Sequence, residues 1–147
     1  MRWLLVAFVI LGCGGESQRD ELAGTEWALS INPICSFVQT FGESGEYSRA
    51  IGCELASGSI GLQQEIGTYD IAGAQLTMIA AQSTCADADK VSTVGFSVTP
   101  TTLTIVTPNS VTVFTKLAPG PSTGGTAVFG CHDFAAGVFT PMPLAPL

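Results

Sequence analysis

The chain is poor in charged residues and poorest in basic ones. Of its 147 residues only 12% are charged, and five Lys and Arg stand against twelve Asp and Glu, which gives a net charge of −7. Five basic residues spread along the chain cannot form the clustered positive patch that binds nucleic acid phosphates, so nucleic acid is excluded as a partner. With 46% hydrophobic residues the composition also excludes a disordered chain.

Helical periodicity and long apolar runs are missing as well. No segment repeats apolar residues at the i, i+3, i+4, i+7 spacing of an amphipathic helix. The most apolar stretch, residues 3–11, holds nine residues. At about 1.5 Å each they cannot cross a hydrocarbon core of about 30 Å, which excludes a permanent membrane-spanning helix there.

The first residues have the layout of a signal peptide. Arg2 precedes the apolar stretch, and the small residue Gly12 and then Cys13 follow it. Residues 10–13 (ILGC) resemble the bacterial lipobox, which implies a signal peptide at residues 1–12 and fatty acyl groups such as palmitate on Cys13. The alternative is an ordinary secretory signal cleaved near Gly14 or Gly15, which would leave Cys13 free.

Loss of this signal would make the protein more acidic. Without Arg2, four basic residues remain against twelve acidic ones, and 4 − 12 gives −8. An acidic body is repelled by anionic lipid, so membrane attachment would depend on the acyl anchor, with residues 13–23 as a tether. The uncharged Gly14 resembles the second residue of lipoproteins sorted to the outer membrane. We therefore expect a lipid-anchored protein of the bacterial cell envelope, in the outer membrane.

The other four cysteines are an even number, as expected for disulfides in an oxidising compartment. They are Cys35, Cys53, Cys85 and Cys131. We expect Cys53 to pair with Cys85 and Cys35 with Cys131, although the sequence permits three pairings. Metal binding is a weaker alternative, because no two of these cysteines have the spacing of a zinc knuckle. No cofactor is expected.

Short runs rich in β-branched and aromatic residues alternate with turn residues. Eight runs predict strands, at residues 25–31, 35–41, 46–53, 62–71, 75–80, 91–98, 102–106 and 111–116. Sequential strands with short connections fit an all-β fold, a small antiparallel up-and-down barrel over residues 24–117, because a closed barrel leaves no exposed edge strands. A two-sheet β-sandwich is the alternative.

An ordered series of motifs over about residues 22–117 resembles bacterial lipocalin-like lipoproteins. The series comprises Gly24, Thr25 and Trp27, then residues 42–47 (GESGEY), residues 65–71 (EIGTYDI) with Gly73, Leu76 and Thr77, residues 103–105 (LTI), and Val113, Phe114 and Lys116. The resemblance implies a barrel that binds a small apolar molecule at its open end.

By strand alternation, five aromatic side chains are candidate ligand-binding residues of that barrel. They are Trp27, Phe37, Tyr47, Tyr69 and Phe96. Aromatic residues at every second position also form the ordinary core of a small barrel, and this alternative carries more weight. Lys116 is expected to contact Trp27 if the first and last strands adjoin.

No catalytic residue is predicted, and the protein is expected not to be an enzyme. His132 and Asp133 are neighbours in sequence, but neighbours in a strand point to opposite sides and no nucleophile motif accompanies them. Asp87 and Asp89 lack the remaining ligands of an EF-hand calcium loop, which leaves a solvated polar loop as the better interpretation.

The C-terminal region, residues 118–147, differs in composition from the rest. It begins with a Pro/Gly-rich segment at residues 118–126 and has three prolines among its last seven residues. Proline disfavours helices and central strands, whereas the apolar residues argue against disorder. We expect this tail to lie along the barrel, held there by a disulfide of Cys131.

Two functions are consistent with these features. The first is a membrane-anchored, non-enzymatic module that binds a small hydrophobic or lipid-like ligand. The second is a structural or inhibitor-like lipoprotein with a filled barrel, which contacts another envelope protein.

Lipidation of Cys13 is directly testable. Mass spectrometry of the mature protein from a bacterial host should find acyl chains on an N-terminal Cys13, and the Cys13→Ser variant should lack them and leave the membrane fraction. An unmodified N-terminus at Gly14 or Gly15 in the wild-type protein would contradict the prediction.

Overall fold

The computed structural model describes residues 21–118 and 126–147. They form an eleven-stranded sheet. Its strands are β1 (Thr25–Asn32), β2 (Cys35–Phe41), β3 (Glu46–Glu54), β4 (Ile60–Ala72), β5 (Gln75–Ser83), β6 (Val91–Val98), β7 (Thr102–Thr107), β8 (Ser110–Lys116), β9 (Ala127–Asp133), β10 (Val138–Pro141) and β11 (Ala145–Pro146). Within the described residues, no helix is long and apolar enough to cross a membrane.

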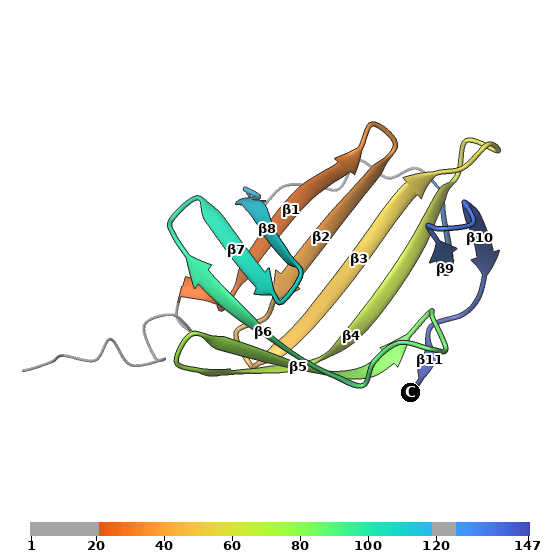
Figure 1. The fold of residues 1–147 in the computed structure, drawn as a ribbon. Helices are drawn as coiled ribbons and strands as arrows, with labels where there is room; N and C mark the ends of the chain where they lie inside the picture. The colour runs from red at the N-terminus through yellow and green to blue at the C-terminus, as the bar shows by residue number, and fades with distance from the viewer. Residues whose placement is uncertain (1–20, 119–125) are drawn as a thin grey trace, which may run out of the picture.

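Strands β1 to β8 form a closed antiparallel barrel. Each pairs with the next along the chain, and β8 returns to pair with β1. Figure 1 shows this circuit, with β1 and β8 side by side. The all-β class, the eight strands and the up-and-down order that the sequence predicts are confirmed, and the sandwich alternative is not what forms.

Closure of the barrel brings Trp27 and Lys116 together. The two residues are opposite each other in the β1–β8 pair. The Lys116 Nζ atom lies 5.8 Å from the centre of the Trp27 ring, within the range of a cation–π contact. The expected contact is therefore confirmed.

A single apolar core lies inside the barrel. Its buried members come from all eight barrel strands and from the segment before β1: Leu22, Trp27, Phe41, Tyr47, Tyr69, Leu76, Met78, Phe96, Leu103, Ile105 and Phe114. Leu22 is fully buried, although it falls in the segment expected to be a tether. The folded body therefore begins before Gly24.

Strand β4 is shared between two sets of neighbours. Its C-terminal half, from Glu65, pairs with β5, whereas its first residues, Ile60 to Leu62, pair in parallel with β9. The register with β5 shifts between Ile66 and Gly67, which marks a bulge. A Cβ atom at Gly67 would collide with the backbone carbonyl of Ile79, so glycine permits the close approach of the two strands at this point.

The tail extends the sheet by adding strands next to β4 and β5. Strands β9 and β10 form an antiparallel pair next to β4, and the two-residue β11 pairs with the end of β5. Phe139 packs over Gly61 and Gly130, where a Cβ atom on either glycine would crowd its ring. The tail thus lies along the barrel as expected, but it does so as additional strands at the sheet edges.

The expected disulfide pairing is wrong. The structure joins Cys35 to Cys53 and Cys85 to Cys131. Cys35 and Cys53 are opposite each other in the β2–β3 pair, so their closeness follows from hairpin register, which the sequence pattern locates only approximately. The two disulfides and the attachment of the tail through Cys131 stand, but the partner of Cys131 is Cys85.

The bulge at Gly67 provides a stability test. Gly67→Ala should lower the free energy of unfolding by about 2 kcal/mol or more, because the new methyl group must displace backbone. Gly95→Ala is the matched control within a strand, since the nearest atom to its Cβ would be Val106 Cβ at 3.4 Å. Equal losses for the two variants in urea unfolding would contradict the role of Gly67.

Candidate functional site

A row of polar side chains crosses the inside of the barrel above the apolar core. In register, Trp27 is opposite Gln39, Gln39 is opposite Arg49, Arg49 is opposite Glu65, and Glu65 is opposite Ser83. The Arg49 guanidinium lies 3.0 Å from a Glu65 carboxylate oxygen. Strand alternation directs these residues inward with Phe37 and Tyr47. The barrel interior therefore holds a charged row beside its apolar core.

Two adjoining hollows open beside the charged row, and together we call them the polar mouth. The inner hollow, of about 270 Å³, is lined by Phe37, Arg49, Ile51, Gln63, Glu65, Ser83 and Ala88. The outer hollow, of about 560 Å³, shares Arg49, Gln63, Glu65 and Ala88 and adds Cys85, Asp87, Asp89, Ser92, Cys131, His132, Asp133 and Phe134. The mouth therefore combines barrel strands, the β5–β6 loop and the tail.

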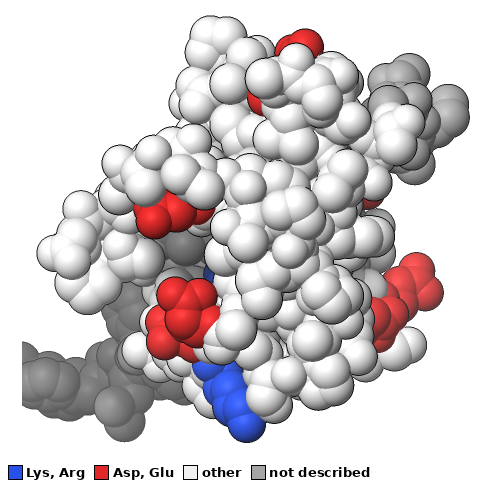
Figure 2. Space-filling model, turned by 90° about the vertical axis from the view of Figure 1, so that its right-hand side faces the viewer, with Lys and Arg blue, Asp and Glu red and all other residues white. Residues whose placement is uncertain are grey.

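The Cys85–Cys131 disulfide builds the rim of the mouth. It ties the β5–β6 loop, which carries Asp87 and Asp89, to strand β9, which carries His132 and Asp133. Figure 2 views the molecule from this side and shows acidic side chains bordering a hollow. Segments far apart in the sequence are thus held around one opening.

Four of the five predicted ligand-binding aromatics lie in the packed core rather than in the mouth. Trp27, Tyr47, Tyr69 and Phe96 are buried members of the core cluster. Phe37 is half-buried and lines the inner hollow. These four positions agree with the alternative that the aromatic residues form the ordinary core of the barrel. That any of the four contacts a ligand stays a prediction. Phe37 is the candidate that lines the polar mouth, whereas Tyr47 lines a separate hollow beside Glu46 and Gly67.

Tyr47 links the apolar core to the charged row. Its hydroxyl donates a hydrogen bond of 2.7 Å to Glu65 Oε1, which also accepts from Arg49. Burial, and then this hydrogen bond to a carboxylate, raise the pKa of Tyr47 well above its ordinary value. Glu65 is therefore held in place by two donors, one from the core and one from the mouth.

His132 and Asp133 have separate local roles. The His132 Nε2 atom lies 2.8 Å from the carbonyl oxygen of Gly61, and its backbone N–H donates to Gln63 Oε1. Asp133 Oδ1 accepts hydrogen bonds from the backbone N–H groups of Ala135 and Ala136. These contacts connect β9 to β4 and shape the β9–β10 turn, and they do not join the two side chains in an acid–base pair.

One group of potential metal ligands occurs in the described part of the chain. Cys85, Asp87 and Cys131 bring their ligand atoms within 4.8 Å of one another. The two sulfur atoms are joined in a disulfide, so neither is available as the thiolate that a metal requires. Asp87 and Asp89 are exposed on the loop, in keeping with the solvated loop that the sequence indicates.

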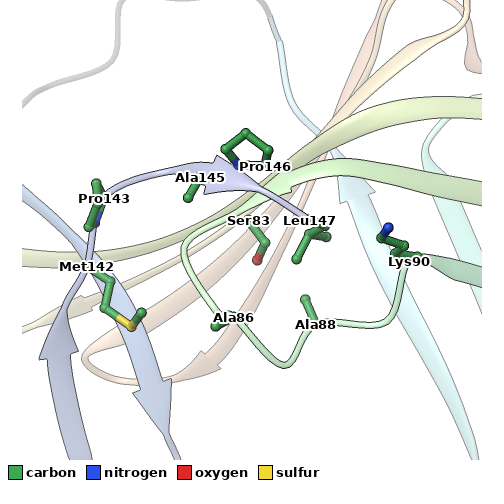
Figure 3. Close-up of a pocket in the computed structure, with 9 residues that line it drawn as sticks. All are labelled: Ser83, Ala86, Ala88, Lys90, Met142, Pro143, Ala145, Pro146 and Leu147. Carbon is green, nitrogen blue, oxygen red and sulfur yellow. The ribbon is translucent and has the colours of Figure 1, made fainter.

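A third hollow, of about 280 Å³, lies beside the mouth under the C-terminal strand. It shares Ser83 and Ala88 with the inner hollow. Figure 3 shows Leu147 and Met142 of the tail lying over Ala86 and Ala88 of the β5–β6 loop. The tail therefore forms one wall of this end of the barrel.

The charged row was missed at the sequence level, although the pattern contained a signal for it. Arg49 is in phase with Tyr47 on β3, and Glu65 and Gln63 are in phase with Tyr69 on β4. Charged and amide side chains on the apolar face of a predicted strand indicate a polar interior or a site. That Arg49 and Glu65 lie side by side is shown only by the register of β3 and β4.

Comparisons with known proteins give one distant structural likeness. No protein-family model matches the chain, and no curated protein matches it. A solved lipocalin-like protein from Bacteroides uniformis has 16% sequence identity and a TM-score of 0.48, and the match covers 66% of this chain and 99% of that protein. Such a likeness concerns the fold and says nothing about a ligand.

The hydrogen bond between Tyr47 and Glu65 predicts a pH dependence of stability. Above pH 10 the tyrosine ionises in the unfolded chain but stays protonated in the folded one, so the free energy of unfolding falls as the pH rises. Between pH 10 and 11 the wild type should lose about 1 kcal/mol more than Tyr47→Phe. Urea unfolding at both pH values measures this difference, and equal losses would contradict it.

Proposed function

We propose that this protein is a lipid-anchored, non-enzymatic barrel that binds a small molecule in the polar mouth. The observation that carries the proposal is the uneven filling of the barrel. Eleven buried apolar residues pack the core, whereas hollows of about 270 and 560 Å³ open beside Arg49 and Glu65. Sites for small ligands are concave and combine apolar walls with a few converging polar groups, as this mouth does.

The wall of the inner hollow fits a ligand that is both apolar and polar. Phe37 and Ile51 are opposite each other on β2 and β3 and offer an apolar surface. Arg49 is the next inward-facing residue to Ile51 on β3, and it is opposite Glu65 on β4. These two side chains offer charge and hydrogen bonds. The ligand would therefore be small and amphipathic, which refines the hydrophobic ligand expected from the sequence.

The membrane anchor is part of the proposal and rests on the sequence. Cys13 and most of the tether lie outside the described residues. The described body begins at Glu21, and Leu22 is part of the buried core.

A second candidate function is contact with another envelope protein. Five exposed apolar residues lie on the outer face of strands β5 to β8: Ile79, Val91, Val106, Val111 and Val113. Ile79 pairs with Val91 across β5 and β6, and Val106 pairs with Val111 across β7 and β8. An exposed apolar face of this kind fits a partner protein with an apolar surface.

Native mass spectrometry of the protein purified from its own host tests the binding function. The wild type should retain a small molecule, and Ala88→Trp should lose it, because the indole would occupy the mouth that Ala88 lines. Ala74→Trp is the control, since Ala74 is exposed in the β4–β5 turn away from the mouth.

Two outcomes would contradict the proposal. Equal retention by Ala88→Trp and the wild type would place the ligand elsewhere. A wild-type protein that carries no small molecule and co-purifies with another protein would support the second candidate instead.

A further inference from the structure

The charges around the polar mouth are unbalanced. Four carboxylates line the outer hollow, from Glu65, Asp87, Asp89 and Asp133, against the single guanidinium of Arg49. Lys90 follows Asp89 in sequence but lines the neighbouring hollow under the C-terminal strand. A concave surface that carries one sign of charge concentrates ligands of the opposite sign.

The protein itself uses only part of this negative charge. Arg49 is paired with Glu65, and Asp133 accepts two backbone N–H groups of its own turn. Asp87 and Asp89 have no hydrogen-bond or ion-pair partner within residues 21–118 and 126–147. The disulfide keeps Asp87 at the rim, since its carboxylate lies within 4.8 Å of both sulfur atoms. Two carboxylates at the opening are therefore free to attract a cation.

An unsatisfied acceptor in the barrel interior points to the same kind of ligand. Gln39 is only 3% exposed, and its Oε1 atom has no hydrogen-bond partner. Gln39 is directly opposite Arg49 and is one inward position from Phe37, and both of these residues line the inner hollow. A buried acceptor without a donor costs about 1–3 kcal/mol, and a ligand N–H group would remove that cost.

We propose that the ligand of the mouth carries a positively charged N–H group, such as a primary ammonium. The inference rests on the binding function proposed above. The ammonium would donate to Glu65, which lines both hollows, and to Gln39 Oε1 beside the inner hollow, and the apolar part would lie against Phe37 and Ile51. Asp87 and Asp89 would attract the ammonium electrostatically from the rim, without contacting it. An anionic ligand would find only Arg49, which Glu65 already occupies.

Three probes of equal chain length separate this inference from the binding function itself. Isothermal titration of the wild-type protein with hexylammonium, hexanol and hexanoate at low salt should give the order of affinity hexylammonium, then hexanol, then hexanoate. We expect about a fivefold or larger difference between the first two, which shrinks at higher ionic strength.

Two variants with equal charge change locate the effect. Asp87→Asn should weaken hexylammonium binding about two- to threefold without changing hexanol binding, because it removes one carboxylate from the rim. Asp70→Asn is the matched control, since Asp70 is exposed on β4 next to the inward-facing Tyr69 and so points away from the interior. Gln39→Leu should lower the affinity for hexylammonium while leaving the protein at least as stable.

The outcomes are distinguishable. Hexanoate or hexanol binding as tightly as hexylammonium would overturn the charge preference and leave the binding function standing. Equal effects of Asp87→Asn and Asp70→Asn would overturn the role of the rim. A wild-type protein that binds none of the three probes would overturn both the inference and the binding function.

Discussion

The polar mouth depends on strand β4, whose first half cannot pair with β5. Strand β4 has thirteen residues, but β5 pairs with it only from Glu65 onward. Buried backbone N–H and C=O groups need partners, so the first half of β4 requires another strand. The tail supplies it as β9, and the β5–β6 loop lines the outer hollow together with Gln63 and Glu65 of β4. Because β4 pairs with β9 at its start and with β5 at its end, the polar mouth opens between these two neighbours. The same arrangement explains why the tail is needed as a strand.

The charged row has a cost that the apolar core offsets. Removing polar groups from water is unfavourable unless each finds a partner, and here Arg49, Glu65 and Tyr47 satisfy one another while Gln39 Oε1 is left without a donor. Leu or Val at position 39 would avoid this penalty and would suit the neighbouring Trp27. Gln39 reduces stability and lies opposite Arg49, which lines both hollows, so its polar side chain is better explained by binding than by folding.

The sequence predicted the barrel well because strand alternation and turn chemistry are local signals. All eight barrel strands were located to within three residues at each end, and the contact of Lys116 with Trp27 followed from closure alone. The disulfide pairing, the strand character of residues 127–133 and the meeting of Arg49 with Glu65 were not predicted. Each depends on register or on contacts between distant segments, which local periodicity does not encode.

The two disulfides differ in what they add. Cys35–Cys53 joins two residues that β2 and β3 already place opposite each other, whereas Cys85–Cys131 joins a loop and a tail that are 46 residues apart. Chain entropy alone gives about 3 kcal/mol for the shorter link and about 4 kcal/mol for the longer one. The larger consequence is geometric, because only Cys85–Cys131 holds the rim of the mouth together. In a reducing compartment the rim would therefore lose its covalent link.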